Sequence, residues 1–266
     1  MKKYEELTFT DDYMFCKVMQ ENEDLCKRVV EVIIGRKIGK IIHNEKQEAI
    51  DVTKNGKGIR MDVFLEDDEN SVYNIEMQNV DTKNIAKRSR YYQGMLDVDY
   101  MERGWEYEKL KKSYIIFINM FDMFGQGLPK YTFTNRCHEK PNLEMGDDTT
   151  KIFLNAQGIC DKIESEIESL IMYLNKGKAT SELTEEIDTR VVNARTNPRW
   201  RTEFMTLYER YQIERKQGLE QGLEQGRNNS ILLFVKNALE RNMSLEDACE
   251  IVGTTVEEYN QLLTNK

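Results

Sequence analysis

Two short alternating runs joined by an acidic turn constrain the fold of this 266-residue chain more than any other feature. The first run covers residues 58–65, the second covers residues 72–78, and the acidic cluster 66–70 lies between them. Apolar and polar side chains that alternate with a period of two are typical of a β-strand with two different faces. The sequence therefore predicts a β-hairpin with an apolar face, a second face that carries polar side chains, and a turn near Glu69.

The register of this hairpin decides which polar side chains meet. Glu76 and Gln78 are two positions apart on one strand, so both project from the same face. Asp62 and Glu76 are equally far from Glu69 along the chain, so a turn centred on Glu69 places them opposite each other. A slip of one residue would put the two carboxylates on opposite faces, which makes this register a specific prediction.

Two carboxylates beside an amide are typical of a site that binds a divalent metal ion. Neighbouring carboxylates repel each other and lose solvation, which is unfavourable unless a cation lies between them. Oxygen ligands of this kind suit Mg²⁺ or Mn²⁺. Such an ion lowers the pKa of a bound water and orients it toward a phosphodiester. The spacing alone also fits a hairpin whose polar face is simply solvated, and by itself it favours that simpler interpretation.

The rest of the chain alternates between helical and strand patterns. Helical periodicity covers residues 10–34, residues 82–104 and most of the chain after residue 160. Strand patterns occupy residues 40–52, 113–120, 130–134 and 151–154. The order α-β-β-β-α-β, followed by helices, predicts an α/β core with a mixed (α+β) sheet and a helical extension. We expect three parts: a core over residues 1–158, a helical extension over 159–226, and a tail of three short helices over 227–266.

Two features mark the C-terminal half. A repeated QGLE tetrad places Gly218, Gly222 and Gly226 on one stripe of a helix, which fits either a joint or a close helix–helix contact. In the tail, Ser244 and Thr255 have the pattern of helix N-caps. The outline resembles a helix-turn-helix module, but its second helix opens with two acidic residues, which oppose phosphate. We therefore favour packing or self-association for the tail.

The composition of the chain argues against several classes of protein and of active site. The chain has no secretory signal and no apolar run long enough to span a bilayer, so we expect a cytoplasmic protein without a membrane partner. Its five cysteines are never spaced C-x-x-C, which argues against a disulfide framework and a thiolate zinc site. Two histidines leave little room for His-based acyl transfer. The net charge of −9 opposes general nucleic-acid binding, but Lys83, Lys87, Arg88 and Arg90 form a local cationic cluster.

Several motifs, in order, resemble one family. The segments 60–63 (RMDV), 75–78 (IEMQ) and 88–92 (RSRYY) resemble those of the Rpn family of recombination-promoting nucleases, also described as PD-(D/E)XK family transposases. Residues 11–17 (DDYMFCK) match the D-x-x-F opening of that family, and residues 107–112 (YEKLKK) fit the stretch before its next buried strand. The resemblance extends over essentially the whole chain.

The resemblance implies a restriction-endonuclease-like αβββαβ core that cuts DNA with Mg²⁺, or with Mn²⁺ in its place. Asp62 and Glu76 would be the metal ligands, and they would form the catalytic set together with Gln78. Gln78 takes the position of the lysine in the superfamily motif. A neutral amide donates and accepts hydrogen bonds there, but it neither supplies positive charge nor acts as a base.

Further roles are implied for the neighbouring helices. Arg88 would bind a substrate phosphate, and Tyr92 would assist it, although core packing is the favoured role for Tyr92. Asp12 would add a third acidic group, or it would serve as a helix N-cap. The partner that the resemblance implies is DNA. The oligomeric state stays open, although a double-strand cut made by one site per chain would favour a homodimer. The alternative is a catalytically silent nuclease-fold scaffold or DNA-binding protein that assembles through its helical tail.

Overall fold

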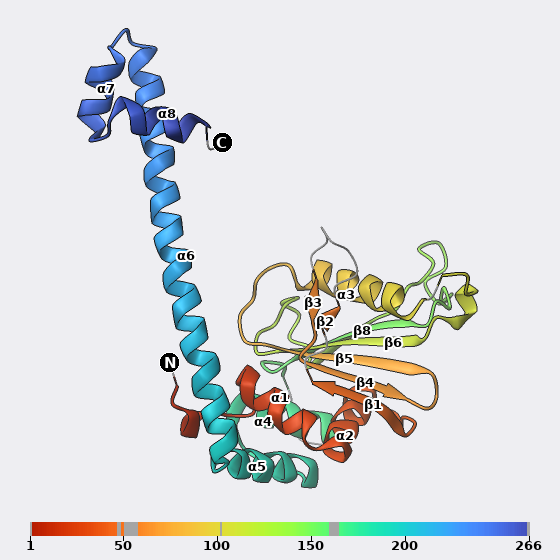
Figure 1. Cartoon of the computed structure of the whole chain (residues 1–266). Helices are drawn as coiled ribbons and strands as arrows, with labels where there is room; N and C mark the ends of the chain where they lie inside the picture. Colours follow the sequence, from red (N-terminus) through yellow and green to blue (C-terminus); the bar gives the residue numbers. More distant parts are fainter. Residues whose placement is uncertain (1, 47–48, 51–57, 102, 160–164, 265–266) are drawn as a thin grey trace. The chain divides into compact units, whose positions relative to one another are not determined.

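A six-stranded mixed sheet forms the centre of the structure (Figure 1). The structure is a computed structural model, and it describes residues 2–46, 49–50, 58–101, 103–159 and 165–264. The strand order is β1-β4-β5-β6-β8-β7. The neighbours β5, β6 and β8 run parallel, and the other pairs are antiparallel. The strands are β1 (Ile41–Lys46), β4 (Val63–Asp67), β5 (Ser71–Gln78), β6 (Lys112–Asn119), β7 (Lys130–Phe133) and β8 (Thr149–Asn155). A separate pair is formed by β2 (Ala49–Ile50) and β3 (Ile59–Arg60).

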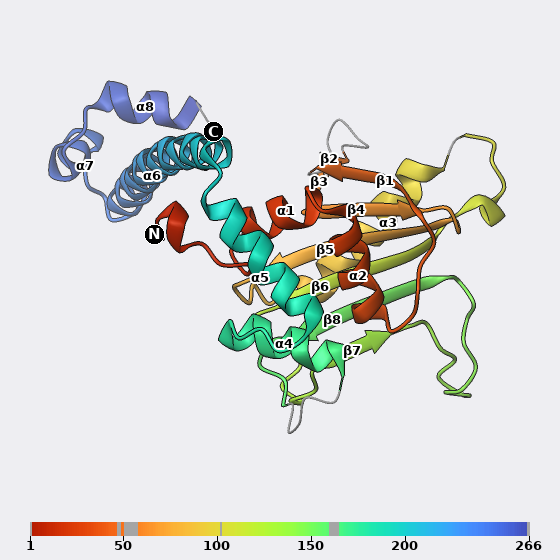
Figure 2. The ribbon, with the colours of Figure 1, turned by 90° about the horizontal axis from the view of Figure 1, so that it is seen from below.

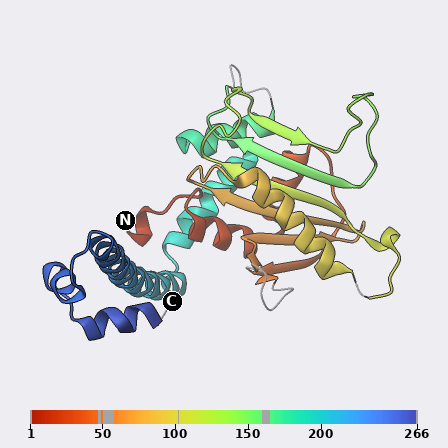
Figure 3. The ribbon, with the colours of Figure 1, turned by 90° about the horizontal axis from the view of Figure 1, so that it is seen from above.

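Helices cover both faces of this sheet. One helix, α3, lies on one face, and α1, α2, α4 and α5 lie on the other (Figures 2 and 3). Their bounds are α1 (Asp12–Gln20), α2 (Glu23–Ile34), α3 (Ile85–Tyr100), α4 (Glu166–Lys176) and α5 (Glu182–Arg195), with short 3-10 turns at η1 (Tyr4–Glu6) and η2 (Tyr107–Lys109). A parallel strand buried on both faces is apolar throughout, which explains the run Tyr114–Ile118 in β6. The order confirms the predicted αβββαβ core with a helical extension.

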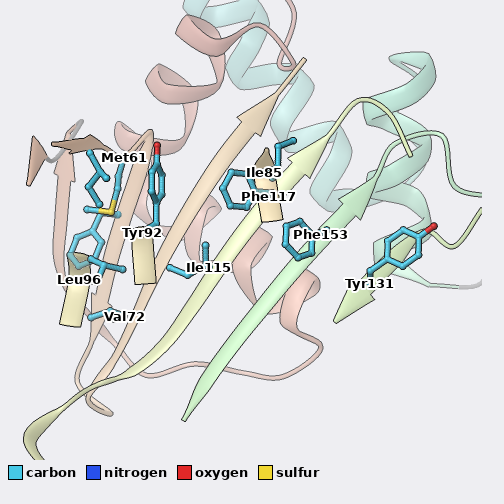
Figure 4. Close-up of a cluster of buried hydrophobic side chains, with 11 residues drawn as sticks. Met61, Val72, Ile85, Tyr92, Leu96, Ile115, Phe117, Tyr131 and Phe153 are labelled. Carbon is cyan, nitrogen blue, oxygen red and sulfur yellow. The ribbon is translucent and has the colours of Figure 1, made fainter. Parts of the chain in front are cut away.

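The polar face of the hairpin is buried rather than solvated. Phe64, Asn74 and Glu76 lie on this face and are all nearly inaccessible to solvent, because α3 packs over it. The apolar cluster beneath α3 joins side chains from the helix, the hairpin and the parallel strands (Figure 4). Its members are Ile59, Met61, Phe64, Val72, Ile85, Tyr92, Leu96, Ile115, Phe117, Tyr131 and Phe153. The simpler interpretation of a solvated polar face is therefore wrong.

The first predicted strand of the hairpin is divided in two. The chain bends at Met61 and Asp62, because β3 leaves the main sheet to pair with β2 while β4 stays in it. Met61 consequently packs in the same cluster as Phe64, although strict alternation over residues 58–65 would place these two on opposite faces. The side chain of Gln20 donates to the carbonyl oxygen of Asp62 at 2.8 Å, which gives this bent residue a hydrogen-bond partner from α1.

The C-terminal helices differ from the predicted outline in one respect. The described residues form two compact units, Met1–Arg201 and Thr202–Lys266. Helix α6 (Pro198–Leu239) runs unbroken through residues 218–226, so the glycine stripe forms no joint. Apart from the adjacent backbone of α6 itself, no described atom lies within 4 Å of a Cβ built at any of its three glycines. The first of the three expected short helices is thus the end of α6.

No helix among the described residues is long and apolar enough to cross a membrane. The three-part division at residues 158 and 226 stays a prediction.

The last two helices have the predicted caps. They are α7 (Leu245–Val252) and α8 (Val256–Thr264). The Ser244 hydroxyl accepts from the main chain of Asp247 at 3.1 Å, and Thr255 and Glu258 exchange hydrogen bonds in a capping box. Gly253 ends α7 in the left-handed conformation.

Candidate active site

The hairpin register brings Asp62 and Glu76 together. Val63 pairs with Ile75, so the next residues outward, Asp62 and Glu76, face each other as predicted. The main-chain nitrogen of Asp62 donates to Oε1 of Glu76 at 3.1 Å. The main-chain nitrogen of Met77 donates to Oδ2 of Asp62 at 3.1 Å. Each carboxylate thus accepts a hydrogen bond from the opposite strand, which fixes both side chains at the end of the hairpin.

Burial makes this acidic pair costly to ionise. Glu76 is 2% exposed, and Asp62 is half-buried. Burial, and then the charge of Asp62, raise the pKa of Glu76 to about 8. Burial also raises the pKa of Asp62, to about 6, with a further contribution from the charge of Asp12. Two neighbouring carboxyls with raised pKa values form a site that holds either a proton or a cation at neutral pH.

Arg88 on α3 is the cation that the structure places at this pair. Its Nη2 donates to Oε2 of Glu76 at 2.8 Å, and its Nη1 donates to Oε1 of Gln78 at 3.0 Å. The guanidinium lies over two aromatic rings, 5.2 Å from the centroid of Tyr92 and 5.0 Å from that of Phe117. These rings and the ion pair hold the guanidinium in one orientation.

Gln78 is oriented by its neighbours. Its Nε2 donates to the carbonyl oxygen of Met77 at 2.7 Å, so its Oε1 is turned toward Arg88. The sequence shows that Gln78 itself brings no positive charge. The structure places the Arg88 guanidinium within hydrogen-bond distance of this amide, so a cation does stand beside the position of the superfamily lysine.

Tyr92 and Asp12 occupy different positions relative to the pair. Tyr92 is buried in the cluster beneath α3, which confirms its expected core packing, and burial raises its pKa to about 12. Asp12 is the first residue of α1 and Asp11 is the N-cap, so of the two alternatives for Asp12 the N-cap role is wrong. Asn79, just after β5, donates to Oδ1 of Asp12 at 2.8 Å.

One face of α1 lines the site, which the sequence reasoning missed apart from Asp12. Asp12, Cys16 and Gln20 follow one another at a spacing of one helical turn, and so they share a face. Burial and the charge of Asp62 raise the pKa of the Cys16 thiol, which places that thiol near the pair as a neutral group. Gln20 binds the main chain of Asp62. The spacing of four residues was a signal in the sequence that pointed to this face.

The donor set fits a hard divalent ion that keeps much of its own water. Among the described residues, no group of three or more His, Cys, Asp or Glu side chains is placed to bind a metal. In that described part of the chain, the acidic side chains that meet at the hairpin end are the carboxylates of Asp62 and Glu76. Mg²⁺ binds through one or two carboxylates and retains waters, whereas a closed zinc site needs four protein ligands.

Sequence comparison identifies a family whose pattern covers this site. The family described as PD-(D/E)XK nuclease family transposase matches residues 9–186, which is more than half of the chain and includes every residue of the site. Searches of curated proteins and of solved structures give no significant match.

Proposed function

The chain belongs to the PD-(D/E)XK nuclease transposase family, and on that premise we propose that it is a metal-dependent DNA endonuclease. The observation that carries the proposal is the meeting of Asp62 and Glu76 at one end of the hairpin, in the register in which the two carboxylates face each other. Arg88 joins Gln78 to this pair, because its guanidinium donates to both Glu76 and Gln78. The family supports a nuclease with a role in mobile elements or recombination. The metal dependence, the internal cleavage of DNA and the residue roles are our inference.

Asp62 and Glu76 would hold Mg²⁺, or Mn²⁺ in its place. When bound, such an ion supplies an activated water and stabilises the charge that grows on the phosphate oxygens. The protein contributes the orientation of both carboxylates, which the main-chain nitrogens of Asp62 and Met77 fix from the opposite strands. Because the pKa of Glu76 is raised to about 8, binding of the ion near neutral pH would release a proton from this pair.

Arg88 and Gln78 would complete the site from its α3 side. Arg88 keeps the buried Glu76 from carrying an uncompensated charge, and its guanidinium is held rigid by two aromatic rings. This arrangement also presents positive charge beside Gln78, where it would attract a phosphate oxygen. Gln78 would hydrogen-bond the attacking water or the phosphate through its amide.

A second candidate is a nuclease-fold protein that binds DNA without cutting it. The buried ion pair between Arg88 and Glu76 favours this candidate, because it already neutralises one of the two proposed ligands. The neutral side chain of Gln78 also favours this candidate, because it supplies no positive charge at the position of the superfamily lysine. In this case the helical tail would serve assembly.

Nicking of a supercoiled plasmid distinguishes the two candidates. We expect the wild-type protein to nick in Mg²⁺ or Mn²⁺ and not in EDTA, and we expect Asp62→Asn and Glu76→Gln to abolish nicking. Glu69→Gln, at the exposed turn of the same hairpin, is the matched control and should cut normally. Equal nicking by the wild type and both site variants would refute the site. If the folded wild-type protein binds DNA but does not nick it in Mg²⁺, in Mn²⁺ or in EDTA, the second candidate is established.

A further inference from the structure

A cationic pocket adjoins the acidic pair. It has a volume of about 560 Å³, lies between β3 and the first half of α3, and shares Arg88 with the site. Cationic and aromatic side chains dominate its wall: Arg60, Lys87, Arg88, Arg90, Tyr91 and Tyr92. No acidic residue is among the described residues that line it. A volume of this size is typical of pockets that take a small ligand or one unit of a polymer.

The charge of the pocket contrasts with that of the chain. The whole chain has a net charge of −9, yet four cationic side chains line this pocket. Three of them come from the start of α3 and one comes from β3. Lys87 and Arg90 are exposed, and among the described residues neither has a carboxylate partner. On an otherwise acidic protein, these two exposed cations attract phosphate groups to this one place.

The aromatic side chains of the pocket indicate a ligand that has a flat apolar face in addition to a phosphate group. Tyr91 lines this pocket and is 40% exposed, and Ile59 adds apolar surface to the lining. The bases of an intact duplex are stacked inside the helix, so they do not reach into a concave pocket. A base that has left the stack presents its flat face, and aromatic side chains bind that face regardless of sequence.

We propose that this pocket binds one unstacked nucleotide of the DNA strand next to the bond that is cut. Tyr91 stacks on the base, while Lys87 and Arg90 bind the flanking phosphates. The position relative to the cut bond rests on the proposed nuclease function, but binding of the nucleotide does not. The inference gives the site a substrate preference: single strands, flaps and frayed ends over intact duplex.

Fluorescence anisotropy in EDTA tests the proposal without any cleavage. A labelled single strand and a blunt duplex of the same length are titrated with the full-length protein. We expect tighter binding of the single strand, and we expect Tyr91→Ala to weaken it by about tenfold while leaving duplex binding nearly unchanged. Tyr91→Phe should bind as the wild type does, because the ring is retained. Tyr107→Ala is the matched control, since that tyrosine is 81% exposed and lies outside the pocket.

The cations are tested by the salt dependence of the same binding. Lys87→Gln and Arg90→Gln should each lower the slope of log affinity against log salt by about one, and Lys109→Gln in η2 should not. Equal affinity of the wild type for single strand and duplex would overturn the proposal. So would equal losses in Tyr91→Phe and Tyr91→Ala. Normal metal-dependent nicking with equal affinities would refute the pocket alone, whereas selective single-strand binding without nicking would refute the nuclease alone.

Discussion

Nη2 of Arg88 lies 2.8 Å from Oε2 of Glu76, and this contact joins the helix on one face of the sheet to the end of the hairpin. Glu76 is almost fully buried, so this guanidinium is the main compensation for its charge. The same guanidinium reaches Gln78 through its other nitrogen. One side chain therefore links the proposed metal ligand to the amide that replaces the superfamily lysine.

The stability of the protein should depend on pH through Glu76. Its pKa is raised from an ordinary value of 4.5 to about 8, so the folded state binds a proton that the unfolded state releases. Without metal, the free energy of unfolding should therefore fall by on the order of a few kcal/mol as pH rises through this window. Urea unfolding of the wild type and Glu76→Gln at several pH values in EDTA measures it. A difference between the two proteins that is constant with pH would contradict the raised pKa.

Adding Mg²⁺ should reverse this loss. The ion binds the deprotonated carboxylates, so it should raise the melting temperature more at a pH above the pKa of Glu76 than at a pH below that of Asp62. Thermal melts with and without Mg²⁺ give the comparison. A stabilisation that is larger at the lower pH would show that the ion binds elsewhere.

Removing the Arg88 side chain should destabilise the fold in a pH-dependent way. In Arg88→Met the buried Glu76 carboxylate loses its partner, which we expect to cost about 3 kcal/mol where the carboxylate is ionised and less where it is protonated. Chemical unfolding of the variant at alkaline and at mildly acidic pH provides the test. Lys83→Met serves as the control, because the ion pair of Lys83 with Asp81 lies at the surface. Equal losses in the two variants would contradict the account of Arg88.

Transferring the positive charge from Arg88 to position 78 should preserve part of the nicking activity. Arg88→Gln should reduce nicking strongly, because the substitution removes the cation that lies within hydrogen-bond distance of Gln78. Adding Gln78→Lys to that variant should recover part of the loss, since the lysine returns positive charge to the same position. Initial nicking rates of the single and double variants at saturating Mg²⁺ give the answer. A double variant no better than Arg88→Gln would show that charge at this position is not what matters.

The buried face of the hairpin should behave as core. Phe64→Ala removes a side chain that is nearly inaccessible beneath α3, and we expect a loss of about 3–5 kcal/mol of unfolding free energy. Tyr107→Ala, at an exposed ring, should change it by less than about 0.5 kcal/mol. A loss in Phe64→Ala as small as that of the control would contradict the packing of α3 on this face.

The sequence was sufficient to predict the pairing of Asp62 with Glu76. Alternation with a period of two and an acidic turn determine the register locally, and the structure confirms it. The bend at Met61 was beyond local reasoning, because it arises from the pairing of β3 with β2, a non-local contact. Burial of the polar face was missed for a related reason: Asn74 and Glu76 read as surface residues until α3 is placed over them.

The surroundings of the pair were predicted less well. Nothing in the segment 88–92 indicates that both terminal nitrogens of Arg88 bind side chains of β5, because that depends on the distance between α3 and the sheet. The contribution of α1 could have been found in part. Asp12, Cys16 and Gln20 share one helical face, but only the tertiary structure shows that this face is turned toward Asp62.

The central claim is that Asp62 and Glu76 act together as one site for a divalent ion. Calorimetric titration of the metal-free protein with Mn²⁺ tests it most directly, with Glu76→Gln and Glu69→Gln as the matched pair of variants. We expect one ion per chain in the wild type and in Glu69→Gln, with proton release on binding, and no such binding in Glu76→Gln. Unchanged Mn²⁺ affinity in a folded Glu76→Gln protein would contradict the claim.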